Sequence, residues 1–149
     1  MNQPPLQRCR EAHAGILLAL DNASHAANRP DPVRLLAVSK TRTAAEVAAL
    51  AETGQRAFGE NYVQEALPKV EALRELGLEW HLIGHLQSNK ADAAARSFDW
   101  VQSLDRPRLV AALARHRPAG LPPLNVLLQV NIDDEVSKHG CAPADVAAL

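Results

Sequence analysis

VRLLAVSKTRTAAEV, residues 33–47, is the stretch of sequence that decides the fold. It opens with an apolar run, Val33–Val38, which is typical of a strand buried in a sheet. Thr43 followed by Glu46 has the spacing of a capping box, and this spacing predicts a helix start soon after the strand. Lys40 lies between the two, at the far end of the strand. Its ammonium group is either solvated at the rim of an ordinary sheet or the working group of a site.

The composition is that of an ordinary globular domain. The 149 residues are about one average domain, and 47% of them are hydrophobic while 22% are charged, which argues against disorder. Sixteen basic and 17 acidic residues leave a formal net charge of -1. This balance gives no electrostatic reason for binding nucleic acid or an anionic membrane, so we expect neither as a partner.

The cysteines and the N-terminus indicate an intracellular protein. Cys9 and Cys141 lie far apart in the sequence and have no metal-like spacing, so we expect reduced thiols in the cytoplasm. The apolar run ILLAL, residues 16–20, is shorter than the core of a signal peptide and has no cleavage site after it. No stretch approaches the roughly 20 apolar residues of a membrane-spanning helix.

Short apolar runs alternate with alanine- and leucine-rich amphipathic stretches, after a first predicted helix over residues 4–27. The predicted strands are 34–39, 56–60, 80–84, 100–104 and 125–132, and the helical stretches between them are 43–54, 61–77, 88–98 and 106–120. Gly54 and Gly77 stand where helices would end, and Pro107 stands near a helix start. We expect Pro68 to kink or split its helix, and APADVAAL, residues 142–149, looks like one more helix.

This alternation predicts an α/β fold with a parallel sheet built from βαβ units. The chain lacks the glycine fingerprints of nucleotide-binding folds, which weakens a Rossmann interpretation. The alternative is a (β/α)8 barrel of the TIM type, in which working residues gather at the C-terminal ends of the strands. The chain would supply an N-terminal helix and about the first five βα units. We therefore expect residues 1–149 to form a single, incomplete barrel domain.

Two residues at the predicted strand ends have a structural and a functional interpretation. In a partly desolvated pocket, Lys40 would have a lowered pKa and a larger fraction of the neutral amine that attacks carbonyl groups. At an ordinary strand end it would extend its ammonium group into water. Asn61 could contact a bound ring, but an asparagine after a strand serves equally well as a helix cap.

Other polar groups have simpler explanations. His81 and His85 bracket a strand and a glycine without an obvious third ligand, so we predict no metal site. The loop Gln87–Lys90 could bind an anion at a helix start, although Ser or Asn capping explains the same residues. Glu135 and Lys138 are most simply solvated charges in a loop that also contains His139, and Cys141 has no activating partner.

Four spaced motifs resemble one known family. LLAVSKTRTAAEV, FGENYVQEAL, EWHLIGHLQSNK and LLQVNIDDEVSKHG, together spanning roughly residues 30–141, are similar to the pyridoxal phosphate homeostasis proteins. Those proteins resemble the N-terminal barrel domain of alanine racemase, of fold type III. The match rests mainly on AVSKT and GENYVQE.

The resemblance implies a (β/α) barrel that binds pyridoxal 5'-phosphate (PLP) as a Schiff base on Lys40, with Asn61 and His81 near the cofactor. It implies a role in vitamin B6 and amino-acid homeostasis without efficient catalysis, so no catalytic residue is predicted. We expect a monomer, with PLP-dependent apoenzymes as recipients of the cofactor. In the family pattern the phosphate is held by later barrel loops, and we expect this chain to hold the cofactor weakly.

The alternative is a PLP-dependent, racemase-like enzyme of the same fold type. Racemisation needs proton transfer on both faces of the substrate carbon. Alanine racemase uses a tyrosine from a second, β-rich domain, and nothing here corresponds to that domain. The only tyrosine, Tyr62, already belongs to GENYVQE.

Overall fold

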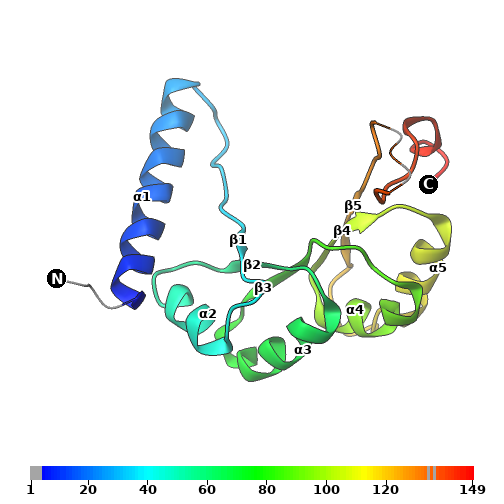
Figure 1. Ribbon diagram of the computed structural model, residues 1–149, viewed down its shortest axis with the longest axis horizontal. Coiled ribbons are helices and arrows are strands. Elements are labelled where there is room, and N and C mark those ends of the chain that lie inside the picture. Colours follow the sequence, from blue (N-terminus) through cyan, green and yellow to red (C-terminus); the bar gives the residue numbers. More distant parts are fainter. Residues whose placement is uncertain (1–4, 134, 136) are drawn as a thin grey trace.

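The computed structural model of the chain describes residues 5–133, 135 and 137–149, and strands and helices alternate along it (Figure 1). The strands are β1 (Ala37–Val38), β2 (Ala57–Glu60), β3 (Glu79–Leu82), β4 (Trp100–Leu104) and β5 (Asn125–Leu128). The α-helices are α1 (Pro5–Ala26), α2 (Ala44–Ala51), α3 (Val63–Ala72), α4 (Ala91–Ser97) and α5 (Pro107–His116). Short 3-10 helices are η1 (Arg74–Leu76), η2 (Ser88–Lys90) and η3 (Pro143–Asp145).

The five strands form one parallel sheet in the order β1-β2-β3-β4-β5. Each strand therefore pairs with the next strand of the sequence, and α2 to α5 all lie along the same side of the sheet (Figure 1). Sequential parallel strands with every connecting helix on one side are the arrangement of a (β/α) barrel wall. The predicted α/β fold is confirmed: an N-terminal helix is followed by five parallel strands, and each of the first four strands is followed by an α-helix.

The core lies between the sheet and these helices. Phe58, Trp80, Leu82 and Val101 point to this side from the strands, and the helices contribute Val47, Ala66, Ala94, Leu109 and Leu113 among others. Phe58 and Trp80 contact each other with ring centroids 5.9 Å apart. Because each large apolar side chain gains about 1.5–3 kcal/mol on full burial, this layer supplies most of the stability.

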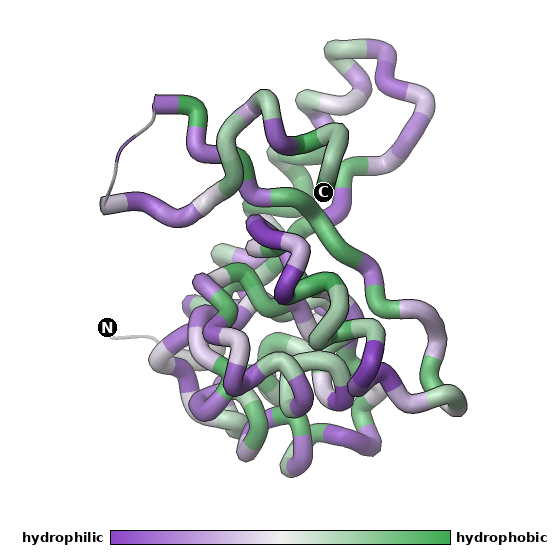
Figure 2. The backbone as a smooth tube through the Cα atoms, turned by 90° about the vertical axis from the view of Figure 1, so that its right-hand side faces the viewer, coloured by the Kyte–Doolittle hydropathy of each residue, from purple (hydrophilic) through white to green (hydrophobic). Residues whose placement is uncertain are grey.

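The opposite side of the sheet is left open by the described residues. Val38 is 52% exposed there, and every residue of β5 is exposed. Figure 2 shows the apolar β5 segment running along the outside of the molecule. α1 stands at the other end of the sheet and contacts α2 (Figure 1).

The buried His13 fastens α1 to the sheet. Its ring contacts Gln55 Oε1 at 3.2 Å and Thr53 Oγ1 at 2.8 Å. The Gln55 amide in turn donates to the carbonyl oxygens of Leu35 and Ala57. This chain of hydrogen bonds links the N-terminal helix to the start of the first two strands.

Most predicted boundaries agree with the structure. The capping box is present, since Thr43 accepts from the Glu46 N–H while Glu46 accepts from the Thr43 N–H. That backbone hydrogen bond, with the Thr43 hydroxyl and Arg42, holds the pKa of Glu46 below its ordinary value. Gly77 ends η1 with a left-handed φ of 58°, and Pro107 is the first residue of α5.

The structure contradicts two details of the predicted helices. Pro68 does not split α3, which continues past it to Ala72, so of the two predicted effects only the kink stays a prediction. The break comes later, at Leu73, where the chain passes into η1. Residues 142–149 form η3 and turns instead of an α-helix. Pro143 lies at the start of η3, a position where a missing N–H costs nothing, so a single tight turn forms there.

Two further findings concern membrane spans and the cysteines. Within the described part of the chain, no helix has both the length and the apolar character needed to cross a membrane. Both cysteines are free thiols, with Cys9 exposed and Cys141 buried.

Candidate functional site

Lys40 stands in a tight turn directly after β1. The Arg42 N–H donates to the Ser39 carbonyl oxygen at 3.0 Å, which closes a β-turn with Lys40 and Thr41 as its central residues. Thr41 has a φ of 64°, as the third residue of a type II turn requires. A β-branched residue rarely adopts this conformation, and the strain is on the order of 1–3 kcal/mol.

The Lys40 side chain is exposed. The partly desolvated pocket expected around a reactive lysine is therefore not formed by the described residues. The turn instead presents the amine to the open end of the sheet, at the C-terminal end of β1, where barrels of this type place their working groups.

A buried polar cluster lies beneath this turn. Lys69 Nζ, on α3, donates to Glu60 Oε1 at 2.8 Å and to the Ser39 carbonyl oxygen at 2.9 Å. Ser39 Oγ donates to the same Glu60 oxygen at 2.6 Å. Glu60 is fully buried, and its Oε2 has no hydrogen-bond partner among the described residues. Neither Glu60 nor Lys69 stands out in the sequence, because both occur in segments that read as ordinary strand and helix.

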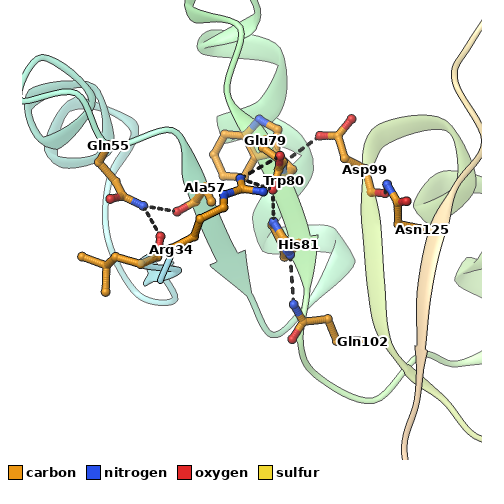
Figure 3. A network of polar contacts seen from close by, with 10 residues as sticks. Arg34, Gln55, Ala57, Glu79, Trp80, His81, Asp99, Gln102 and Asn125 are labelled. Atoms are coloured by element: carbon orange, nitrogen blue, oxygen red, sulfur yellow. Dashed lines mark hydrogen bonds and ion pairs between the residues drawn. The ribbon is translucent and has the colours of Figure 1, made fainter. Parts of the chain in front are cut away.

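His81 is held rigidly on the open side of the sheet (Figure 3). Its Nε2–H donates to Glu79 Oε1 at 2.7 Å, and the Gln102 amide donates to its Nδ1 at 2.9 Å. Its ring stacks on that of Trp100, with the ring centroids 5.5 Å apart and the ring planes 4° apart. Both ring nitrogens are engaged, so His81 is fixed in one orientation.

Glu79 is the link between His81 and the chain before β1. Its carboxylate accepts both from His81 and from Arg34, at 2.9 and 3.0 Å from the guanidinium (Figure 3). Burial alone would raise the pKa of Glu79, but the hydrogen bonds from His81 and Arg34 outweigh it and lower the pKa below its ordinary value.

Asn61 follows β2 and lines a cavity of about 400 Å³. The cavity is also lined by Tyr62, Val63, Gln64, Gly84, His85, Gln87, Lys90 and His139. The cap interpretation of Asn61 is wrong, because Tyr62 occupies the N-cap position of α3 and no side chain caps that helix. The strand ends approach each other closely here, since a Cβ on Gly84 would lie 2.2 Å from the Asn61 carbonyl oxygen.

The loop Gln87–Lys90 is also not explained by capping. Gln87 precedes η2 and Lys90 precedes α4, and neither helix start has a hydrogen bond from a capping side chain. Gln87 and Lys90 instead face the cavity that Asn61 lines.

His85, Asp105 and His139 form a cluster that sequence reasoning missed. They offer ligand atoms within 4.8 Å of one another. His85 Nδ1 is buried without a hydrogen-bond partner in the described part of the chain, and it lies 3.9 Å from Asp105 Oδ2. The rings of His85 and His139 stack face to face, with centroids 3.5 Å apart and planes 12° apart. Because imidazole lone pairs lie in the ring plane, the two rings do not direct them at one point, and the cluster is not arranged as a metal centre.

Burial lowers the pKa of His85, as do the charges of His139 and Arg106, while Asp105 opposes them. Its ring is therefore neutral near pH 7. Glu135 and Lys138 are exposed and pair with each other at 2.8 Å, in agreement with the prediction of solvated charges.

A larger cavity of about 780 Å³ lies between α1, α2 and the free edge of β1. It is lined mainly by apolar groups such as Ala12, Val47 and Phe58. Lys40, Asn61 and His81 are not among its lining residues, although Ser39 and Arg42, which flank the turn that carries Lys40, are.

The predicted site residues lie on three neighbouring strands. Val38, Gly59 and His81 are paired in register across β1, β2 and β3. Lys40 and Asn61 each follow their strand partner by two residues. Since strands lie about 4.8 Å apart and rise about 3.3 Å per residue, the three residues spread over about two strand spacings, with Lys40 and Asn61 two residues, or roughly 6.6 Å, further along the strand direction than His81.

Comparisons with proteins of known name show which family the chain belongs to. A sequence profile of the alanine racemase N-terminal domain matches residues 19–149. The pyridoxal phosphate homeostasis protein of Pseudomonas aeruginosa is 53% identical over 137 residues, which are 91% of this chain and 60% of that protein. The corresponding Escherichia coli K12 protein is 51% identical over 136 residues, covering 87% and 58%. The chain thus spans about three fifths of the length of these curated relatives.

Solved structures show the same fold. PipY of Synechococcus elongatus, 40% identical, superimposes with a TM-score of 0.73 without PLP and 0.71 with PLP bound. The match covers 87% of this chain and about 60% of PipY. Alanine racemase of Corynebacterium glutamicum, 18% identical, reaches a TM-score of 0.54 over 78% of this chain and 34% of that enzyme, which shows a shared fold alone. The chain therefore belongs to the alanine racemase N-terminal domain family and, within it, to the pyridoxal phosphate homeostasis proteins.

Proposed function

We propose that this chain binds PLP through a Schiff base on Lys40 and holds it for the supply of the cell rather than for catalysis. The observation that carries the proposal is the strained turn at the end of β1, which presents an exposed amine where a barrel places its working residues. The PLP-bound structure of PipY and the names of the curated relatives support the choice of cofactor.

The residues at the open end of the sheet fit this group. PLP supplies an aldehyde that reacts with a primary amine. The neutral Nζ of Lys40 adds to the aldehyde carbon, and the carbonyl oxygen leaves as water with both amine hydrogens, so that a C=N bond replaces the C=O bond. Lys40 suits this step because it is exposed and has no hydrogen-bond partner among the described residues.

Asn61 and His81 would serve this site differently. The Asn61 side chain does not cap α3, and Asn61 lines a cavity, so its amide can donate to or accept from a bound ring. Both nitrogens of His81 are already engaged, and Trp100 covers one face of its ring. We therefore assign His81 a packing role on the open side of the sheet.

The supply of cofactor to PLP-dependent apoenzymes and a monomeric, cytoplasmic state stay predictions. Purified protein loaded with PLP should restore activity to an apoenzyme in proportion to the cofactor it carries. Amino acids added to the loaded protein should be neither racemised nor decarboxylated at an appreciable rate. Turnover that is abolished in Lys40→Ala would instead favour the racemase-like alternative.

The test of cofactor binding is an absorbance spectrum of the chain mixed with PLP, beside Lys40→Ala and Lys90→Ala. A Schiff base absorbs at visible wavelengths, away from protein. We expect a band in the unsubstituted chain and in Lys90→Ala but not in Lys40→Ala. Borohydride reduction followed by mass mapping should place the adduct on Lys40. Equal weak bands in all three proteins would mean nonspecific lysine chemistry, and the proposal would fail.

A further inference from the structure

We propose that Lys69 and Glu60 are positioning residues that hold the turn Ser39–Arg42 and so fix the place from which Lys40 reacts. This inference rests on the proposed function of Lys40. No resemblance or sequence pattern assigns a role to either residue, and neither touches the open side of the sheet where the cofactor would lie.

The pair is the most deeply buried ion pair in the described part of the chain. Glu60 has no exposed surface, and the Lys69 side chain is 11% exposed. Removing two opposite charges from water is costly, and such pairs are retained only where good geometry and further hydrogen bonds compensate. Here the further hydrogen bonds all go to one residue, Ser39.

The buried pair holds Ser39 at two points, in addition to the hydrogen bond that its N–H donates to the Gly59 carbonyl oxygen at 2.9 Å. The Ser39 carbonyl oxygen accepts from Lys69 Nζ at 2.9 Å, and its hydroxyl donates to Glu60 Oε1 at 2.6 Å. The same carbonyl oxygen also accepts the Arg42 N–H that closes the turn. Lys69 therefore binds directly to the atom on which the turn depends.

The strain in the turn explains why it needs such support. Thr41 holds a positive φ that a β-branched residue disfavours, so the turn would relax if Ser39 were free to rotate. Strained backbone persists only where the surrounding structure over-determines it. The strand hydrogen bond fixes the Ser39 N–H, and the buried pair adds the constraint on its carbonyl oxygen and hydroxyl. Lys40 lies between this restrained residue and the strained Thr41.

Lys69 is not itself a second reactive amine. Its Nζ already has two acceptors and little exposure, whereas Lys40 is exposed. Lys69 therefore binds the backbone of the turn, whereas the Lys40 amine stays available to react.

The first test needs no cofactor. Amide hydrogen exchange is measured at two sites. The Arg42 N–H closes the turn, and the Asn125 N–H donates to the Asp99 carbonyl oxygen at the opposite edge of the sheet, in β5. We expect Lys69→Met to accelerate exchange at Arg42 by about tenfold and to leave Asn125 unchanged, as a local opening would. The matched control is Lys138→Met, which removes an exposed Lys–Glu pair of the same 2.8 Å length and should alter neither amide.

The second test links the turn to Lys40. We expect Lys69→Met to weaken the visible adduct with PLP by about tenfold in apparent affinity, as a misplaced reactive group does. Thr41→Gly removes the strain, since glycine adopts a positive φ readily. In the Thr41→Gly background, the loss caused by Lys69→Met should therefore be clearly smaller. If Lys69→Met alone does not fold, the neutral pair Lys69→Met with Glu60→Gln takes its place.

Each result separates the two proposals. Equal acceleration at Arg42 and Asn125, or no acceleration at either, would overturn the positioning role. An undiminished penalty in the Thr41→Gly background would overturn it as well. Absence of a Lys40 adduct in the unsubstituted chain refutes the proposed function alone, because the exchange measurement still decides whether the pair holds the turn.

Discussion

Gly84, two residues after β3, packs against the backbone of Asn61, which follows β2. A Cβ at this position would lie 2.2 Å from the Asn61 carbonyl oxygen and 2.8 Å from its carbonyl carbon. These are backbone atoms that cannot rotate away as the end of a flexible side chain would. The position of Asn61 at the site therefore depends on the absence of a side chain at residue 84.

We expect Gly84→Ala to lower the free energy of unfolding by about 1–3 kcal/mol, the usual cost of overpacking. Displacement of Asn61 should also weaken PLP binding. Gly15→Ala is the matched control, because a Cβ there meets nothing within 4 Å and the position is inside α1. That control should stabilise the protein by about 0.5–1 kcal/mol. Urea unfolding measures both, and an equal effect of the two substitutions would contradict the crowding at Gly84.

The sequence predicts single residues well where the reason is local. Lys40 at a strand end and the Thr43–Glu46 capping box are both found, because spacing along the chain determines them. The contacts of Lys69 could not be predicted, since its partner Ser39 is 30 residues away and the two meet only when α3 packs on the sheet. Asn61 was ambiguous for the opposite reason, because one local pattern suits both a cap and a ligand contact.

The segment after β5 is fastened to the end of the sheet by a few contacts. Val130 and Cys141 form an isolated bridge, and the Gln129 amide donates to the His139 carbonyl oxygen at 3.1 Å. His139 then stacks on His85. This stack lines the cavity beside Asn61, so the segment and the candidate site share a wall.

We expect acid to weaken the attachment of the segment after β5 to the end of the sheet. The pKa of His85 is lowered in the folded state, by burial first and by His139 and Arg106 next, from an ordinary value of 6.5. Below pH 6.5 the unfolded chain therefore binds more protons than the folded one, so stability is lost as pH falls from 6.5 toward the lowered pKa. Asp105 opposes the shift but does not cancel it.

We expect urea unfolding at about pH 7.5 and about pH 5.5, on either side of the ordinary histidine pKa, to show this loss in the unsubstituted chain. His85→Asn should reduce it. His139→Asn should reduce it less, because it removes only one of the causes that lower the pKa. Identical pH profiles for His85→Asn and the unsubstituted protein would show that His85 does not contribute.

Strand bounds were predicted best where a strand is paired with a neighbour on both sides. β4, paired on both sides, has the predicted bounds 100–104, whereas the predicted strands 34–39 and 125–132 shrink to two and four residues. Both shortened strands are edge strands with one neighbour. An apolar run shows that a segment can pair but not how far a partner extends beside it.

The molecule as a whole is a sheet covered on one side. Helices α2 to α5 bury Phe58, Trp80 and Val101, while the other side carries Val38 and, by strand alternation from Trp100 and Asn125, Leu127. Leu127 is 47% exposed and lies on an edge strand. Exposed apolar surface beside an unpaired strand edge favours association with other apolar surfaces or with a second chain.

We expect the chain, monomeric when dilute, to bind an apolar dye such as anilinonaphthalene sulfonate in its native state and to associate as its concentration rises. Leu127→Lys should reduce both, because a charge on the open side opposes apolar contact and a lysine on an edge strand opposes pairing. Its free energy of unfolding should change by no more than about 0.5 kcal/mol, as for other exposed positions.

Val110→Lys provides the comparison, since Val110 is an exposed apolar residue on α5, on the covered side of the sheet. Fluorescence titration and sedimentation velocity would measure the two effects. Equal reductions in the two variants would mean that net charge, rather than the open side of the sheet, controls association. If only Leu127→Lys reduces dye binding and association, the surface through which the chains associate is on the open side of the sheet, where Lys40 and His81 also lie. PLP binding and self-association would then compete for that side.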